Sequence, residues 1–399
     1  RATQQGDGAG TQELSLSADE FLNLVYHGRS QLPASGAGEV GGQLSLAADL
    51  GRVSALARGW VPIQEGVVIA GRVQHELELG ATLRDRTPLG ARLTLQGGID
   101  GLAARDGQGR ALDLAGLAQL AVALEATADL EHGTLSVKKA TLNAGPVSFA
   151  GEFEAADLAF GPTPAATPTL RKGKLHLEAD LERLRGTLAQ VLDLSELSFG
   201  GRLSADATLE GGGDALALHG TLDGRALSVA GAKLAELRGE LDARRASDGS
   251  LSGTGTLHLG AFELALAEQK QLALPGATVQ LALRESAGGR GEHSLGFETT
   301  DGALKLALNA RSERTAEELT LRTAFRLDAR VAQLAELAAP FAPVEPGLTG
   351  NLRGEGDLHA TLRASALTRA GGKLAVHLTE LALRDAAGER QALTALAQT

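Results

Sequence analysis

Apolar and polar residues alternate along most of this chain, and that alternation restricts it to β-sheet. The period-two pattern covers residues 92–97, 134–142, 174–181, 256–267, 277–285, 303–312 and 373–385. Successive side chains of a strand point to opposite faces of its sheet. Each segment therefore places Leu and Val on one face and charged residues on the other, which is typical of an antiparallel sheet with one solvated side.

Glycine dipeptides separate many of these segments and predict hairpin turns. Asp-Gly occurs at 100–101, 106–107, 223–224, 248–249 and 301–302, and Gly-Gly at 97–98, 211–212, 288–289 and 371–372. Both dipeptides suit turns that need positive φ. The proline-rich segments 161–169 and 339–347 predict loops, and residues 1–11 a frayed start.

Helical periodicity is confined to short amphipathic segments that resemble one another. They begin near residues 50, 181 and 331, and a fainter copy begins at Phe21. The first three are followed, about twenty residues later, by the strand openings 71–73, 201–203 and 350–352. We interpret these as helix–loop–strand repeats within one elongated β domain over residues 12–399. Their unequal spacing excludes a strict solenoid.

A sheet with one apolar face must cover that face by packing on a second sheet, closing into a barrel or curling over a ligand. Aromatic residues make up only 3% of the chain, so the apolar face is built mainly from Leu and Ala. Roughly 30 strands at about 4.8 Å spacing are too many for an open sheet that neither curls nor splits. We therefore predict a mainly β fold: a long, curled antiparallel sheet, like a taco or groove, with a few short helices. A closed sandwich would give the same alternation.

A curled trough lined by Leu and Ala lacks the bulky side chains that would fill it, which leaves room for acyl chains, each buried methylene contributing about 0.8 kcal/mol. The inward strand positions are therefore the candidate residues for holding lipid. They are Leu93, Leu95, Leu135, Val137, Leu175, Leu177, Leu257, Leu259, Leu264, Leu266, Leu281, Leu283, Leu304, Leu306, Leu308, Leu374, Val376 and Leu378. The helices are expected to cover part of this apolar groove. The residues expected to do so are Leu50, Val53, Trp60, Leu181, Leu184, Leu188, Val191, Val331, Leu334 and Phe341.

The sequence gives little support for a nucleic-acid-binding, metal-binding or catalytic site. The net charge of -11 gives no reason to expect nucleic acid and disfavours adsorption to an anionic membrane. The chain has no Cys, and its nine His residues lack the spacing of metal ligands; His176, His258 and His377 should lie on the polar face. We find no catalytic constellation, and so predict a protein that is not an enzyme and needs no cofactor or metal. The chain starts at Arg1, so we expect a piece of a longer protein, with any membrane anchor outside it.

Residues 178–211, EADLERLRGTLAQVLDLSELSFGGRLSADATLEG, combine a short helix with a strand opening of the type LxGRLxADxxLxG. Weaker copies cover residues 47–73 and 327–358. In the last copy Arg330 stands where the motif has Asp, and Asn351 replaces its Arg. In these features the chain resembles the AsmA-like/TamB superfamily of bridge-like lipid-transfer proteins, which includes the inner-membrane subunit of the translocation and assembly module.

The resemblance implies a periplasmic segment anchored to the inner membrane by a missing N-terminal helix. Such a segment would carry phospholipid acyl chains between the inner and outer membranes and support outer-membrane biogenesis, with an outer-membrane barrel protein as a possible partner. The residues alone leave two alternatives, a structural surface protein or adhesin scaffold and a carbohydrate-active β-helix enzyme. The chain has one Trp and one Tyr, so a carbohydrate-active enzyme would have few aromatic side chains on which to stack sugar rings, which argues against that alternative.

Overall fold

A computed structural model describes residues 2–4, 9–18, 21–33, 35–85, 87–114, 116–117, 119–158, 169–194, 197–212, 215–265, 271–315, 318–339, 347–363, 366–384 and 390–393. The chain is mostly strand, with open antiparallel sheet and three short helices, which confirms the predicted fold class. It divides into two compact units, Arg1–Gly211 and Gly212–Thr399. The single β domain expected over residues 12–399 stays a prediction.

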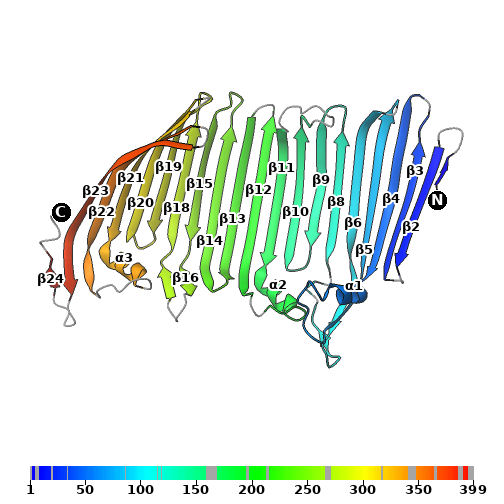
Figure 1. The fold of residues 1–399 in the computed structure, drawn as a ribbon, viewed down its shortest axis with the longest axis horizontal. Helices are drawn as coiled ribbons and strands as arrows, with labels where there is room; N and C mark the ends of the chain where they lie inside the picture. The colour runs from blue at the N-terminus through cyan, green and yellow to red at the C-terminus, as the bar shows by residue number, and fades with distance from the viewer. Residues whose placement is uncertain are drawn as a thin grey trace. The chain divides into compact units, whose positions relative to one another are not determined.

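Unit 1 is an antiparallel meander in which nearly every strand pairs with its neighbours along the chain (Figure 1). Strand β6 pairs with both β7 and β8, so β7 is an excursion beside a ladder that continues directly to β8. The strands are β1 (Ala2–Gln4), β2 (Ala9–Ala18), β3 (Leu22–Gln31), β4 (Ala37–Asp49), β5 (Val68–Arg84), β6 (Thr87–Arg105), β7 (Ala111–Leu112), β8 (Ala121–Asp129), β9 (Thr134–Asn143), β10 (Val147–Ala156), β11 (Thr169–Asp180) and β12 (Phe199–Gly212).

Unit 2 repeats this plan. Strands β15 and β16 run one after the other along β14 in a single register, and β15 also pairs with β18, so the β16–β17 hairpin is again an excursion. The strands are β13 (Ala215–Val229), β14 (Ala232–Arg245), β15 (Leu251–Leu259), β16 (Phe262–Ala265), β17 (Gln271–Leu274), β18 (Ala277–Glu285), β19 (Arg290–Thr299), β20 (Leu304–Arg314), β21 (Glu318–Arg330), β22 (Leu348–Arg363), β23 (Ala366–Arg384) and β24 (Arg390–Ala392).

The three helices begin at the predicted residues: α1 (Leu50–Ala57), α2 (Leu181–Leu188) and α3 (Val331–Ala338). Asp180 caps α2 by accepting a hydrogen bond from the Arg183 N–H at 2.9 Å, and its other oxygen lies 3.3 Å from Arg202 Nε on the paired strand. Asp49 caps α1 in the same way. An N-terminal cap of this kind satisfies a backbone donor that the helix leaves free.

The third helix departs from this motif at two positions that face each other. Arg330, at the cap position of α3, makes no side-chain cap hydrogen bond, and it pairs in register with Asn351. Asp180 and Arg202 occupy the same register pair in the earlier copy. The two departures are compatible with each other, since an Arg at the cap position would repel an Arg on the paired strand.

Each strand that follows a helix opens with a glycine at positive φ. The values are +142° at Gly71, +98° at Gly201 and +145° at Gly350. A Cβ added to Gly350 would lie 3.1 Å from Leu381 Cα, and one added to Gly71 would lie 3.1 Å from Leu102 Cα. Glycine is therefore required at these two openings by both conformation and close backbone approach.

Several local predictions are wrong. The helix expected near residue 21 is strand β3, and part of the expected frayed start forms β1, which pairs with β2. The dipeptides at 97–98, 100–101, 223–224 and 371–372 lie inside strands rather than at turns. Some of these glycines lie beneath a large neighbour: a Cβ on Gly97 would clash with the His75 ring, and one on Gly371 with the His359 ring. Residues 161–168 and 340–346, which make up most of the two expected loops, lie outside the described residues.

The buried core of unit 1 lies at the helix-bearing ends of its strands. Val67, Ala104, Leu114 and Val191 form a cluster with Ile63 and Leu192 packed against it. The segment after α1 is fastened to the end of α2: the Gln64 N–H donates to Val191 O, and the Asp193 N–H donates to Pro62 O at 2.8 Å. Gln64 Nε2 also donates to Ala189 O at 2.6 Å. We call these two segments, residues 62–64 and 189–193, the clasp.

Candidate functional site

The candidate site is the apolar face of the sheet in each unit. Cross-strand registers align the inward residues of successive strands into continuous rows. One row in unit 1 contains Leu14, Tyr26, Leu44, Leu77, Leu95, Leu124, Ala140, Gly151, Leu175 and Ala207. One row in unit 2 contains Leu222, Gly239, Leu257, Val279, Phe297, Leu306, Leu327, Gly354 and Val376.

Large side chains on this face remain accessible to solvent. Leu175 is 41% exposed in unit 1, and Leu281 and Leu374 are 49% and 65% exposed in unit 2. Every described strand belongs to the ladder of its own unit, so no described strand forms a second sheet over this face. Exposed apolar surface on this scale commonly marks a binding surface. The closed-sandwich alternative therefore finds no support in the described part of either unit.

Glycines lower the relief of the apolar face. In unit 2 Gly356 lies opposite Phe325, and a Cβ there would sit 2.7 Å from Phe325 Cε1. In unit 1 the Tyr26 ring similarly covers Gly28 and Gly42. Each ring thus lies flat over a glycine of its own or a neighbouring strand instead of standing up from the sheet. The face is left shallow and smooth, which suits flexible hydrocarbon better than a rigid ligand.

The structure places nearly all of the candidate strand residues on this face. Registers assign the described candidates of unit 1 and those of β15, β18, β20 and β23 to the rows above or to the adjacent rows. Leu264 follows an irregular step at residues 260–261, and Leu266 lies outside the described residues. Sequence reasoning missed Leu77, Leu79, Tyr26 and Phe325, although their strands show the same alternation.

The helices cover only one end of this face. Helix α1 contacts β4 and β5, and α3 contacts β21 and β22. Ala48 and Ala329, which lie on the face two residues before these helices, are buried. The described helix candidates are half-buried or buried, apart from Trp60, which is 88% exposed and covers nothing; that prediction is wrong. Phe341 lies outside the described residues.

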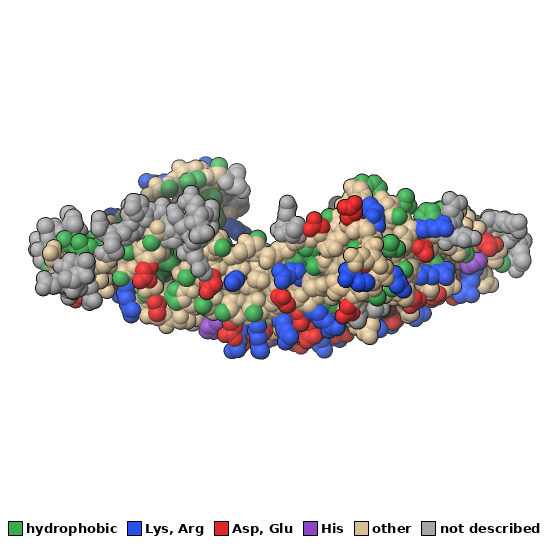
Figure 2. All heavy atoms as spheres, turned by 90° about the horizontal axis from the view of Figure 1, so that it is seen from below, with side chains coloured by type: hydrophobic (Ala, Val, Ile, Leu, Met, Phe, Trp, Pro, Cys, Tyr) green, Lys and Arg blue, Asp and Glu red, His purple; other side chains and the backbone are tan. Residues whose placement is uncertain are grey.

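The opposite face carries the charged residues, whose side chains form ion pairs both within a strand and across strands. Arg326 Nε lies 2.8 Å from Asp328, and Lys305 Nζ lies 3.0 Å from Glu298. Figure 2, which looks onto the helix-bearing strand ends, shows red and blue side chains gathered along one margin. These pairs are exposed and contribute little to stability. They mark this face as the solvated one.

Histidines lie on both faces. As predicted, His176, His258 and His377 are on the polar face, where His176 Nδ1 lies 2.7 Å from Asp206 and His258 Nδ1 lies 3.0 Å from Thr278 Oγ1. The bond to Asp206 raises the pKa of His176. Sequence reasoning missed His75 and His293, which the registers place on the apolar face. Their strands keep the same alternation, so the signal was present.

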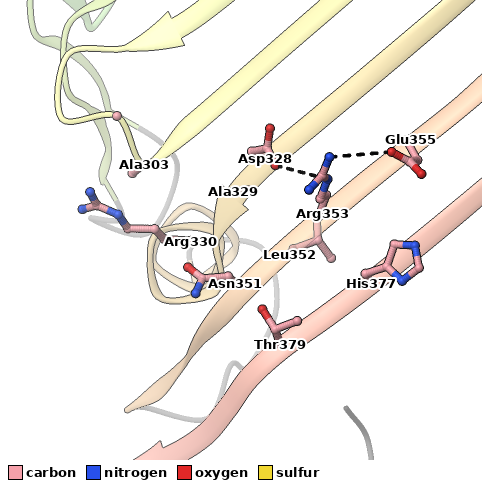
Figure 3. A pocket seen from close by; sticks show the side chains of 11 residues that line it. Ala303, Asp328, Ala329, Arg330, Asn351, Leu352, Arg353, Glu355, His377 and Thr379 are labelled. Atoms are coloured by element: carbon pink, nitrogen blue, oxygen red, sulfur yellow. Dashed lines mark ion pairs between the residues drawn. The ribbon is translucent and has the colours of Figure 1, made fainter. Parts of the chain in front are cut away.

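A second candidate is a polar depression of about 690 Å³ beside the start of α3 (Figure 3). Arg353 lies there between Asp328 and Glu355, 3.9 Å from each, and Arg330 donates to Asp301 O. The guanidinium groups of both arginines in this depression are therefore already paired with carboxylate or carbonyl oxygens. Among the described residues no group of three His, Asp or Glu side chains could hold a metal ion.

Comparison with known proteins finds no match, whether among family models, curated proteins or solved structures. Within the described part of the chain, none of the helices has the length and apolar character needed to cross a bilayer.

Proposed function

We propose that this chain is a non-enzymatic carrier of phospholipid acyl chains, which lie along the apolar face of each sheet. The observation that supports it is a continuous row of residues across successive strands in each unit, mostly Leu with some Val, Ala, Gly and aromatic residues, with exposed leucines on the same face and no described strand packed over it. Each methylene removed from water contributes about 0.8 kcal/mol, so hydrocarbon needs no specific partner on such a surface.

The cellular role follows from the family resemblance and is part of the same proposal. The chain would be a periplasmic segment of an AsmA-like/TamB-type protein, anchored to the inner membrane through parts outside this sequence. It would pass phospholipid between the inner and outer membranes and support outer-membrane biogenesis, where an outer-membrane barrel protein is a candidate partner. For this role the sheets would curl, with the apolar face inward.

The test is lipid content. The purified protein, examined by native mass spectrometry and lipid extraction, should carry phospholipid. Replacing Leu257 and Leu306 with Asp should reduce that content, because both lie in the apolar row of unit 2. The matched control replaces His258 and Ala307 with Asp; these neighbours lie on the same strands but on the polar face, opposite Arg238 and Arg326.

The possible outcomes are distinct. Lipid loss in the first variant, with circular dichroism unchanged and the control loaded normally, supports the carrier. Lipid-free wild-type protein that takes up no fluorescent phospholipid would overturn it and favour a structural scaffold. Unfolding of the first variant alone would show that the apolar face is packed against protein, because a buried unpaired carboxylate is costly.

A further inference from the structure

Four arginines form a row across the polar face of unit 2, near the strand ends opposite α3. The ladder joins Arg244, Ser252, Arg284, Glu292, Arg311 and Arg322 in one register line. With strands about 4.8 Å apart, this basic row extends over roughly 24 Å. We call Arg244, Arg284, Arg311 and Arg322 the basic row.

Most of this row lacks counter-charges. Arg311 lies 3.5 Å from Glu292, but Arg244, Arg284 and Arg322 have no ion pair with any described residue. Elsewhere on the same face, arginines such as Arg238 and Arg326 are paired. Two acidic groups near the row are engaged with arginines outside it: Glu313 lies 3.2 Å from Arg290, and Glu318 lies 3.9 Å from Arg363.

Arg311 and Arg322 are directly opposed on neighbouring strands. Like charges at directly opposed positions destabilise a sheet. The Arg311 side chain is 81% exposed, so the row is open to a partner. An arrangement that costs stability and remains exposed is expected where it serves binding.

The apolar face has exposed leucines at these same strand ends. Leu283 and Leu251 are 37% and 38% exposed, and Leu358 is 51% exposed. Leu283 directly precedes Arg284 in β18, so the two side chains leave the strand on opposite sides. The strand ends are thus basic on one side and apolar on the other.

We propose that this margin of unit 2 binds the surface of a bilayer containing anionic phospholipid. The guanidinium groups of the basic row contact the phosphates, and the exposed leucines enter the boundary between headgroups and acyl chains. Basic residues attract anionic lipid surfaces, and apolar side chains beside them strengthen interfacial binding. Nucleic acid fits less well, because no aromatic residue interleaves with the row to stack on bases. The net charge of -11 opposes this contact only weakly at physiological salt, because charges farther than about 8 Å, the Debye length, from the lipid surface are largely screened.

The experiment is sedimentation of the full chain with intact vesicles. Phosphatidylcholine vesicles are compared with vesicles that also contain phosphatidylglycerol, at about 0.01 M and about 0.15 M salt. We expect binding only with phosphatidylglycerol, and weaker binding at the higher salt. Replacing the four arginines of the basic row with Gln should weaken binding at least tenfold. The matched control replaces three other arginines with Gln in the same way and should bind like the wild type. These are Arg238, Arg326 and Arg353, which lie on the same face but are ion-paired.

The proposal is overturned if the wild type ignores phosphatidylglycerol vesicles or if the basic-row variant binds as well as the control. Binding to polyglutamate but not to vesicles would assign the row to an acidic protein, and would also overturn it. The lipid content of the purified protein is measured separately. Loss of vesicle binding with normal lipid content, or the reverse, therefore distinguishes this proposal from the carrier function.

Discussion

Gly350 and Gly71 show how single residues define the helix–loop–strand repeat. Both hold backbone at positive φ, and a side chain at either would meet the backbone of the adjacent strand. Gly80, in the middle of β5, has ordinary φ, and nothing lies within 4 Å of the Cβ position. Glycines of similar sequence context therefore have different structural roles.

Gly350→Ala should lower the free energy of unfolding by about 1–3 kcal/mol, because it adds both conformational strain and a close contact. Chemical denaturation measures this. Gly80→Ala is the control and should be neutral or slightly stabilising. Equal effects of the two substitutions would show that the strand opening tolerates a side chain.

His176 provides a pH-dependent contact. Its hydrogen bond with Asp206, with smaller contributions from Glu178, raises the pKa of the imidazole above its usual 6.5. A raised pKa in the folded state means that the contact stabilises fully below the unfolded pKa. That stabilisation is lost as the pH rises through the folded pKa.

Asp206→Asn should lower the pKa of His176, as followed by nuclear magnetic resonance of the imidazole. His132, whose pKa is raised by Asp129, serves as an internal control and should titrate unchanged. A titration of His176 that ignores the substitution would contradict the assigned contact.

Among the elements, the clasp joins segments that are distant in sequence. Gln64 and Leu192 are 128 positions apart, yet Gln64 Nε2 donates to Leu192 O at 3.3 Å. Ile63 and Leu192 form an isolated antiparallel bridge flanked by two backbone hydrogen bonds. This is the close, non-hydrogen-bonded type of pair, in which the side chains are nearest.

Ile63→Cys with Leu192→Cys should form a disulfide, since the chain contains no other Cys and the pair geometry brings the side chains together. Oxidation should stabilise unit 1 by about 2–4 kcal/mol through the long loop it closes. Non-reducing electrophoresis and thermal unfolding measure both effects, and reduction should reverse them. The single-cysteine variants are the controls. Failure to oxidise would place the two segments apart in solution.

The sequence predicted the elements better than their long-range contacts. Helix starts at Leu50, Leu181 and Val331 were readable because an apolar stripe coincides with a local change of period. Phe21 misled because the residues after it, Leu22, Leu24 and Tyr26, alternate and pair as strand β3. Nothing local connects Ile63 to Leu192, so the clasp could not be predicted. The alternation predicted which residues lie on the apolar face. It could not predict that Phe325 covers Gly356, because that contact depends on how neighbouring strands are aligned.

At the scale of the whole molecule, large apolar side chains stay accessible in a folded chain. We expect the native protein to enhance the fluorescence of an apolar dye without denaturant, in proportion to its accessible Leu and Val. The Leu257→Asp and Leu306→Asp variant should give a weaker signal than the His258→Asp and Ala307→Asp control. Far-ultraviolet circular dichroism must show intact sheet in both. If the native protein does not enhance the fluorescence of the dye, these apolar faces are covered.

The β7 excursion and the β16–β17 hairpin have a consequence for how such a chain diversifies. The ladder passes from β6 to β8 and from β15 to β18 without interruption, although further strands lie between them in the sequence. Because almost every strand depends only on its immediate chain neighbours, a hairpin can be gained or lost without re-specifying the rest. Duplication of short gene segments can therefore widen such a sheet by one hairpin at a time. The number of strands, and with it the width of the sheet, can thus change during evolution without a change of fold.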